Sequence, residues 1–572
     1  MMFLPTTKAE MKKLGWNKLD VILVTGDTYI DSSYIGAAVI GKTLFNAGYK
    51  VGIIAQPNID NAEDITRLGE PELFWGVTAG SIDSMVANYT ALKKKRRNDD
   101  FTPGGENNRR PDRATIVYSN LIKRYFKGGK PIVLGGIEAS LRRIAHYDYW
   151  SKKIRKSILF DAKADILLYG MGEKTVLELT KAIKNSESIK NIKGICYISK
   201  NGEDEIEKTD KYIILPSFES VKQDKIEFIK MFNLFYVNQD PKTAKGLIQK
   251  QDTRYLIHNP PQNYLTQSEL DEIYNIEYER DVHPFYKKMG KTKALETIKF
   301  SITTHRGCYG ECNFCAIAVH QGRTIRSRSE ESILKEAKEI VGRKDFKGYI
   351  NDVGGPTANM YQIECLKKEN YGSCENKRCL YPKKCKTLTV SHKKQIELLK
   401  KLRSLENIKK VFVASGIRYD LILEDKKYGM EYLKEIVEHH VSGQMKIAPE
   451  HIEDNTLDKM GKPGKEYLKQ FKDKFYELNE KTGKKQFLTY YFIAAHPGTT
   501  EKEMKKLKTF VSKELRMNPE QVQIFTPTPM TYSTLMYYTE MNPFTGEKLF
   551  VEKDMNKKRK QKDIVVQKGG RR

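Results

Sequence analysis

The first two hundred residues alternate between short apolar runs and amphipathic stretches. Apolar runs at 19–25 and 50–55 predict two buried strands, and the stretch between them, 33–47, predicts a helix. Runs of similar length predict further strands of the same sheet at 73–77, 131–134 and 165–169. This repeated strand–helix order predicts a doubly wound α/β domain, which we place at residues 1–215.

A second strand–helix series starts near residue 293. The strands that we expect in it lie at 298–307, 348–353, 410–415, 443–448, 487–494 and 521–525. Six strand–helix units in succession predict a partial (β/α)6 barrel at 291–540. Barrels of this kind hold their active site at the carboxyl ends of the strands.

Two segments lack a sheet pattern. Residues 216–290 are predicted to form a helical connector, in which Thr266 and Glu269 make a capping box that opens a helix. Residues 541–572 are predicted to form a disordered basic tail, because 553–572 carries nine Lys or Arg against two Asp and few apolar residues.

Length, charge and cysteine content narrow the class of protein. The chain has 572 residues, which favours two or three domains. Its net charge is +27, but most lysines are scattered, so we interpret the charge mainly as solvated helix faces and leave binding of RNA open. There is no run of about 18 apolar residues that would predict a membrane helix, and Met1–Trp16 lacks the apolar centre of a signal peptide. We expect a cytoplasmic protein without a membrane partner, whose eight cysteines are metal ligands or free thiols.

Three cysteines share one loop after the first strand of the second series: Cys308, Cys312 and Cys315. Their close spacing allows the thiolates to converge on one small object. A disulfide would use two of them, and a closed zinc site would need a fourth ligand. An iron–sulfur cubane can be held by three thiolates with one iron left open. A zinc site and free thiols are the alternatives.

The pattern Cys-x-x-x-Cys-x-x-Cys, with Phe314 before the last cysteine, resembles the signature of the radical SAM superfamily. The resemblance implies a 4Fe–4S cluster in which each cysteine binds one iron and S-adenosylmethionine (SAM) chelates the fourth. It also implies that an electron from the cluster cleaves SAM into methionine and a 5′-deoxyadenosyl radical, which abstracts hydrogen from a substrate.

The same resemblance implies SAM contacts at the strand ends of the barrel. Gly354 and Gly355 occupy the turn that presents backbone to the SAM amino group, although proline replaces the acidic residue usual after them. Glu450 has the position and the chemistry of the residue that binds the ribose hydroxyls. Ser415 and Arg418 are candidates for the SAM carboxylate or the substrate. The alternative for these last three residues is a cap or a salt bridge on the barrel rim.

Four more cysteines lie in a predicted insert, 361–390, after the second barrel strand: Cys365, Cys374, Cys379 and Cys385. Four thiols in one loop of a protein from a reducing compartment favour a second metal site, either zinc or iron–sulfur. Their spacings match no common zinc pattern, and free surface thiols are the alternative.

The N-terminal domain resembles the cobalamin-binding domain that precedes the barrel in one branch of radical SAM enzymes. The motif of that domain is Asp-x-His-x-x-Gly, and here Ser33 stands in the place of the histidine between Asp31 and Gly36. A serine hydroxyl is a poor cobalt ligand, so cobalamin is a doubtful cofactor. We expect the carboxylates at the strand ends, Asp31, Glu138 and Glu173, to line a cleft shared with the cluster, or alternatively to cap helices.

Longer stretches extend the resemblance to one family, among them 20–27, 52–57, 135–143, 352–360, 448–451 and 523–529. From about residue 15 to 545 the chain resembles the YgiQ-type radical SAM proteins. This implies a radical SAM enzyme that binds a 4Fe–4S cluster and SAM. The resemblance names no substrate and no residue that acts on it.

An enzyme of this kind needs an electron donor, and we expect one of the flavodoxin or ferredoxin type. Two alternatives stay open. One is an RNA-modifying enzyme that transfers a methyl or methylthio group, in view of the positive charge. The other is a non-catalytic iron–sulfur electron-transfer protein, which would have no use for Glu450 and the strand-end glycines.

Overall fold

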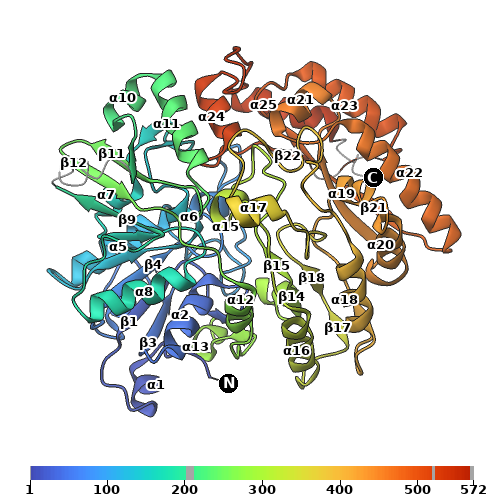
Figure 1. Ribbon diagram of the computed structural model, residues 1–572. Helices are drawn as coiled ribbons and strands as arrows, with labels where there is room; N and C mark the ends of the chain where they lie inside the picture. Colours follow the sequence, from blue (N-terminus) through green and yellow to red (C-terminus); the bar gives the residue numbers. More distant parts are fainter. Residues whose placement is uncertain (1, 201–210, 518, 520–521, 567–572) are drawn as a thin grey trace. The chain divides into compact units, whose positions relative to one another are not determined.

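The computed structural model describes residues 2–200, 211–517, 519 and 522–566 (Figure 1). It contains two compact units. The first comprises Met1–Leu265 and Glu272–Lys299, and the second comprises Thr266–Asp271 and Phe300–Arg572. No helix in the described ranges is long and apolar enough to cross a membrane.

The first unit is built on a nine-stranded mixed sheet. Its parallel core consists of β1 (Val21–Thr25), β3 (Val51–Ala55), β4 (Phe74–Thr78), β5 (Ile132–Leu134) and β8 (Ile166–Leu168). The remaining strands are β9 (Ile195–Ser199), β10 (Tyr212–Ile214), β11 (Gly246–Gln251) and β12 (Arg254–His258). The order across the sheet is β10-β11-β12-β9-β8-β5-β4-β1-β3. Every residue of β1 and β3 is buried, as expected for apolar runs that are covered on both faces.

Helices and two short strand pairs complete this unit. α2 (Gly36–Asn46) contacts α8 (Glu173–Lys184), and α5 (Ala114–Tyr125) contacts α7 (Ile158–Ala162). The other helices are α1 (Lys8–Lys13), α3 (Glu63–Thr66), α4 (Ser84–Asn88), α6 (Gly136–Ser140), α10 (Phe218–Gln223), α11 (Lys225–Val237), α13 (Pro284–Lys287) and α14 (Ala294–Ile298). The strand pairs are β2 (Ile30–Asp31) with β13 (Asp281–Val282), and β6 (His146–Asp148) with β7 (Lys153–Arg155).

The predicted helical connector at 216–290 is wrong in part. Its capping box is present at Thr266 and Glu269, where it opens α12 (Gln267–Tyr274). However, β11 and β12 form an antiparallel hairpin that joins the sheet of the first unit through β9. The turn falls at Asp252, which adopts a positive φ of 55°. Both strands that flank this turn mix polar and apolar residues. A search for continuous apolar runs therefore could not detect them.

The second unit is a partial barrel whose parallel strands follow sequence order. β14 (Ser301–Thr303) pairs with β18 (Asp352–Gly354), and β17 (Tyr349–Ile350) pairs with β19 (Lys410–Val411). β20 (Gln444–Glu450), β21 (Phe487–Ala494) and β22 (Val522–Ile524) form a three-stranded parallel sheet. The N–H of Ile417 donates to the carbonyl of Lys446 at 3.1 Å and so joins the third strand position to β20. Residue 521 of the predicted sixth strand lies outside the described residues.

Helices separate these strands. The helices are α15 (Ile317–Gln321), α16 (Glu330–Val341), α17 (Leu366–Tyr371), α18 (Lys393–Arg403), α19 (Tyr419–Glu424), α20 (Gly429–Glu435), the π-helix η1 (Ile436–His440), α21 (Asp454–Met460), α22 (Lys465–Lys481), α23 (Glu501–Lys513), α24 (Tyr532–Thr539) and α25 (Met555–Val565). A short antiparallel pair, β15 (His305–Arg306) with β16 (Arg326–Ser327), flanks the cysteine loop. One hydrophobic core joins the strands to the helices, with Ile302, Val353 and Phe471 at its centre.

The predicted disorder of 541–572 is corrected for 555–565, which form α25. Asp554 caps this helix by accepting from the N–H groups of Asn556 and Lys557. Val565 is fully buried, and the buried Lys558 donates to the hydroxyl of Tyr537 at 2.9 Å. The prediction from composition missed the buried face of this helix, because a count of charged residues does not show which residues face the core. Residues 567–572 lie outside the described residues.

Candidate functional site

The cysteine loop begins at a turn that requires glycine. Gly307 follows β15 with a φ of 83°, and a Cβ there would collide with the carbonyl of Thr324. The loop then closes on itself, because the N–H of Cys315 donates to the carbonyl of Cys312 at 3.0 Å. All three cysteines of the loop are therefore carried by one rigid turn at the end of the first barrel strand.

The three cysteines are half-buried, and their thiols influence one another. Burial, and then the neighbouring Cys312, raise the pKa of Cys308. The same two causes raise the pKa of Cys315 to about 12. The N–H of Gly310 donates to Cys308 Sγ at 3.3 Å. The raised pKa values mean that the free thiolates of Cys308 and Cys315 are unfavourable. A metal cation binds thiolates in the deprotonated form and would stabilise them. The three cysteine sulfurs therefore suit an iron–sulfur cluster.

Arg418 approaches the loop from the end of the third strand. Its Nη1 lies 3.7 Å from Cys312 Sγ, and a Cβ on Gly310 would come within 2.6 Å of the same nitrogen. Its guanidinium is also paired with Asp420 at 2.7 Å. The rim salt bridge considered for Arg418 is therefore present, and its remaining positive charge faces the cysteine sulfurs.

Glu450 is the last residue of β20 and is buried in a strained backbone conformation. Its φ is 68°, and the pairing of β20 with β21 shifts register between Ile447 and Glu450. The side chain is 8% exposed, and burial raises its pKa to about 7 in spite of Lys462 and Arg418. In the described part of the chain no group hydrogen-bonds its carboxylate. A carboxyl group of this kind at a strand end is a candidate for ligand binding.

The other predicted SAM residues are held by neighbours. The hydroxyl of Ser415 donates to Asp352, so this side chain already has a partner. The carbonyl of Gly354 accepts from Thr304 N–H at 2.7 Å. A Cβ on Gly355 would come within 2.6 Å of the His305 ring, so only glycine fits this turn. The structure thus brings Arg418 and Glu450 toward the cysteine loop, while Ser415 and Gly354 support neighbouring segments.

A buried ion-pair cluster beside the loop was not predicted. Glu311 lies between Cys308 and Cys312 in the sequence and is buried with a lowered pKa. It accepts from Arg323 at 2.8 Å and from Lys368 at 3.2 Å. Lys368 belongs to the cysteine-rich insert, so this cluster anchors the insert to the cysteine loop. The acidic residue inside the cysteine pattern was the only signal in the sequence.

The four cysteines of the insert are unevenly buried. Cys365 and Cys379 are buried, and burial raises the pKa of Cys379 to about 12. Cys365 Sγ and Cys385 Sγ lie 3.8 and 3.2 Å from the hydroxyl of Thr387. Among the described residues, no group of three or more His, Cys, Asp or Glu is placed to hold one metal ion. Thiolates that hold a cluster bind separate irons. The second metal site at Cys365, Cys374, Cys379 and Cys385 stays a prediction.

The strand ends of the first unit are closed by its own chain. Arg110 pairs with Asp27, which follows β1, at 2.8 Å and with Asp99 at 3.1 Å. All three side chains are buried. Arg110 also donates to the carbonyl of Ala79, after β4, at 2.6 Å. The segment that carries Arg110 therefore occupies the edge at which doubly wound domains bind ligands.

The three carboxylates expected in a shared cleft have partners within the first unit. Asp31 pairs with Lys42 at 3.2 Å and accepts from the N–H of Glu279 at 2.9 Å. Glu138 accepts from Ser84 and Thr115 N–H groups at 2.8 and 3.1 Å. Glu173 is buried in the first turn of α8. Glu138 thus accepts from N–H groups at the starts of α4 and α5, as in the helix-cap alternative, and the shared cleft with the cluster stays a prediction.

The segment that matches the cobalamin motif is covered as well. β2, which ends at Asp31, pairs with β13, and Ser33 is buried. Asp31 also accepts from the hydroxyl of Tyr29 at 3.3 Å, so its carboxylate is engaged within its own unit. These residues do not fit a corrinoid that is held from below by the protein.

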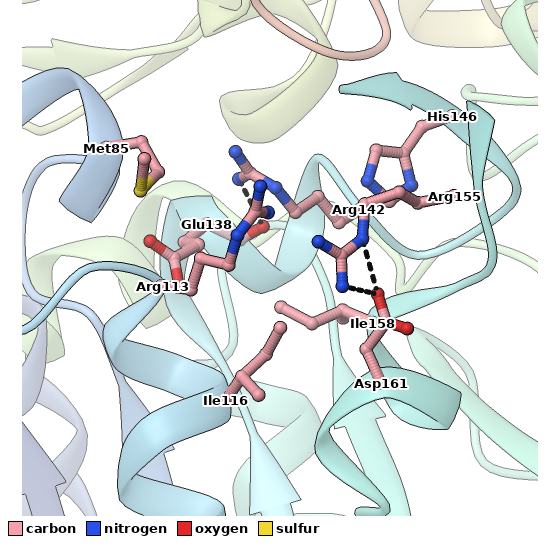
Figure 2. Close-up of a pocket in the computed structure, with 9 residues that line it drawn as sticks. All are labelled: Met85, Arg113, Ile116, Glu138, Arg142, His146, Arg155, Ile158 and Asp161. Carbon is pink, nitrogen blue, oxygen red and sulfur yellow. Dashed lines mark hydrogen bonds and ion pairs between the residues drawn. The ribbon is translucent and has the colours of Figure 1, made fainter. Parts of the chain in front are cut away.

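A small cavity lies near the end of β5 (Figure 2). Arg113, Arg142 and Arg155 line it together with His146. Each arginine pairs with a carboxylate, namely Asp148, Asp83 and Asp161 respectively. Its free space of about 10 Å³ holds about one water. Its charges are balanced and its volume is small, so it is no site for a cofactor.

Family models divide the chain where the structure does. Residues 3–301 match the model described as Radical SAM N-terminal, and 302–511 match the Radical SAM superfamily. Residues 520–568 match a domain of unknown function, DUF3362. With the cysteine loop at a strand end of a partial barrel, these matches define a protein of the radical SAM superfamily.

Relatives give the family. The chain is 64% identical over 569 residues to a UPF0313 protein of Fusobacterium nucleatum, which covers 99% of both chains. It is 50% identical to a UPF0313 protein of Thermotoga neapolitana, over 99% of this chain and 98% of that one. The chain belongs to the UPF0313 family of radical SAM proteins. This confirms the resemblance to a radical SAM family.

Solved structures share the fold. The cobalamin-dependent SAM radical enzyme OxsB with aqua-cobalamin bound matches with a TM-score of 0.51 and 14% identity, over 92% of this chain and 56% of that one. Its form with aqua-cobalamin and SAM bound matches with a TM-score of 0.50. The predicted fold class, a cobalamin-binding-like α/β domain before a radical SAM barrel, is confirmed.

Proposed function

We propose that this chain is a radical SAM enzyme in which Cys308, Cys312 and Cys315 hold the 4Fe–4S cluster that the superfamily implies. When bound, the cluster and SAM supply one electron and a 5′-deoxyadenosyl radical that takes hydrogen from a substrate. The single observation that carries the proposal is the position of three half-buried cysteines on one loop at a barrel strand end, with Arg418 Nη1 3.7 Å from Cys312 Sγ.

Arg418 and the loop backbone have a positioning role in this proposal. The guanidinium favours the thiolate form of the cysteines and is itself oriented by Asp420. The N–H of Gly310 and the hydroxyl of Thr357 contact Cys308 Sγ at 3.3 and 3.6 Å. Hydrogen bonds to the sulfurs are one means by which a protein sets a cluster's potential.

Glu450 is the residue that we assign to SAM. Its carboxyl group is buried without a hydrogen bond from the described chain, and it can accept both ribose hydroxyls. Gly354 and Gly355 form the turn proposed to carry the SAM amino group, since a side chain on Gly355 would meet His305. Ser415 acts indirectly, because its hydroxyl is used by Asp352.

We propose further that the reaction proceeds without cobalamin. Ser33 stands at the position of the cobalt ligand, and the Asp27–Arg110–Asp99 cluster fills the strand ends where a corrinoid would lie. Transfer of a methyl or methylthio group to RNA stays a second candidate, motivated by the net charge of +27. A non-catalytic electron carrier would bind no SAM.

The test is anaerobic reconstitution with iron and sulfide, followed by assay for 5′-deoxyadenosine with dithionite as reductant. We expect the wild-type chain to form a brown chromophore and to cleave SAM, and Cys312→Ala to lose both. Cys196→Ala, which removes a buried thiol of the first unit, is the matched control and should keep both. SAM cleavage at the wild-type rate in Cys312→Ala would sink the assignment.

A further inference from the structure

A groove with a volume of about 640 Å³ lies on the outside of the barrel and is lined by residues of α22 and α23. Six lysines line it: Lys465, Lys469, Lys502, Lys505, Lys506 and Lys513. Two glutamates, Glu453 and Glu514, are the acidic residues of the lining, so the groove is strongly positive. Its floor is apolar, formed by Ile452 and Phe510.

Most of this charge is not neutralised. Lys506 pairs with Glu453 at 2.6 Å. In the described ranges, Lys502, Lys505 and Lys513 have no acidic partner, and all three are exposed. Two of the lysines, Lys465 and Lys502, stand in the first turns of α22 and α23, where the helix dipole makes a cation unfavourable. Lysines in these places raise the local positive potential and so favour an anionic partner.

The groove adjoins the proposed active site. Ile452 and Glu453 lie two and three residues after Glu450, and three residues of extended backbone span at most about 11 Å. Helix α21 starts directly after Glu453, and the carbonyl of its last residue, Met460, accepts from the N–H of Asn313 in the cysteine loop at 2.9 Å. The edge of the groove is therefore close to the cysteine loop.

We propose that this groove docks a small acidic electron-carrier protein of the flavodoxin or ferredoxin type, which gives one electron to the cluster. The carrier is oxidised by one electron and the cluster is reduced by one, with no bond formed or broken. This inference rests on the proposed function, since only a redox cluster needs such a partner. Redox complexes have small interfaces, and charge steers their encounter.

The lining favours a protein over RNA. It contains no arginine for bidentate contacts with bases or phosphates, and its aromatic ring, Phe510, lies beneath Lys469 at 6.0 Å. An apolar floor with a charged rim is the usual composition of a protein–protein interface. RNA binding is therefore an outcome of the test that would contradict the proposal.

The first measurement is binding to the full-length chain without its cluster. A fluorescently labelled acidic flavodoxin is titrated with the wild-type chain at low salt, and anisotropy gives the Kd. We expect the triple variant Lys502→Glu, Lys505→Glu, Lys513→Glu to bind at least about 10-fold more weakly. Wild-type binding should weaken as salt is raised. The matched control changes three exposed lysines on or next to α16, Lys335, Lys338 and Lys344, to Glu and should bind as the wild type does.

The second measurement separates this proposal from the proposed function. In the reconstituted enzyme, the groove variant should cleave SAM at the wild-type rate with dithionite but slowly with reduced flavodoxin. If neither reductant supports SAM cleavage, the proposed function is wrong. The binding measurement then still tests whether the groove docks flavodoxin. Equal flavodoxin affinity in both variants overturns the docking site, as does binding of single-stranded RNA by the groove without binding of flavodoxin.

Discussion

The strand ends of the two units differ in whether a buried carboxylate is neutralised by a neighbouring side chain. In the first unit, Asp27 follows β1 and is paired with Arg110 at 2.8 Å. In the second unit, Glu450 ends β20 with no hydrogen bond from the described chain, and burial raises its pKa to about 7. Both sites lie where α/β folds bind ligands. Of these two carboxylates, Asp27 is neutralised by a guanidinium, whereas Glu450 accepts no hydrogen bond from the described chain.

The same contrast holds for the chain around these carboxylates. The first unit covers its strand ends with the segment that carries Asp99 and Arg110, whose charges balance there. The second unit presents Cys308, Cys312 and Cys315 there. In the proposal that the reaction proceeds without cobalamin, the first unit fills its strand ends with its own polypeptide, whereas the second unit keeps a site. The predictions that follow test this difference.

Removal of Arg110 should have the largest effect. Arg110→Ala leaves Asp27 and Asp99 buried without their positively charged partner, which costs about 3–5 kcal/mol of unfolding free energy. Urea unfolding followed by circular dichroism measures this. The neighbouring exposed Arg109→Ala should change stability by less than about 0.5 kcal/mol. Equal stability of the two variants would show that the cluster does not close the first unit.

Replacement of Glu450 should have the next largest effect, on SAM. A hydrogen bond to a charged group contributes about 1.5–3 kcal/mol, so Glu450→Gln should weaken SAM binding by about 10- to 100-fold. Because burial raises the pKa of Glu450 to about 7, wild-type affinity should fall as pH drops below 7, where the carboxyl group is protonated. The variant should lack this pH dependence.

Equilibrium dialysis with labelled SAM measures the affinity, and iron content checks that the cluster is intact. Glu466→Gln, at an exposed position in the first turn of α22, is the control and should bind SAM normally. An unchanged SAM affinity in Glu450→Gln would contradict the assignment of this residue to SAM binding and leave it a structural role.

The insert should bind its own metal. A variant in which Cys308, Cys312 and Cys315 are all alanine lacks the first site, so metal that remains belongs to Cys365, Cys374, Cys379 and Cys385. Plasma emission analysis should find zinc or iron in an amount that corresponds to about one metal site per chain. Further substitution of Cys379 should remove this metal. A metal-free triple variant with four thiols open to titration would contradict this.

Cobalamin should have the smallest effect, namely none. The chain incubated with hydroxocobalamin and passed through a desalting column should carry no corrin absorbance, and its melting temperature should not change. The enzyme OxsB serves as positive control. A stoichiometric corrinoid on this chain would mean that the first unit opens at Arg110, and the contrast between the two units would fail.

Features that are local in sequence could be predicted from it. Continuous apolar runs placed β1 and β3 within two residues, because a strand buried on both faces has few alternatives. The spacing of Cys308, Cys312 and Cys315 indicated their chemistry, since ligands carried by one loop need no distant partner. The family resemblance covered the whole fold, including the order of its two units.

Pairings between distant residues were decided by the tertiary structure alone. Arg110 meets Asp27 across 83 positions of the chain, and neither residue differs in type from a surface charge. The hairpin of β11 and β12 and the buried face of α25 were missed for the same reason, because burial of a polar residue depends on what packs against it. Residue type and periodicity report the local preference of the backbone. Whether a charge is neutralised, as at Asp27, or left for a ligand, as at Glu450, depends on contacts that only the folded chain brings together.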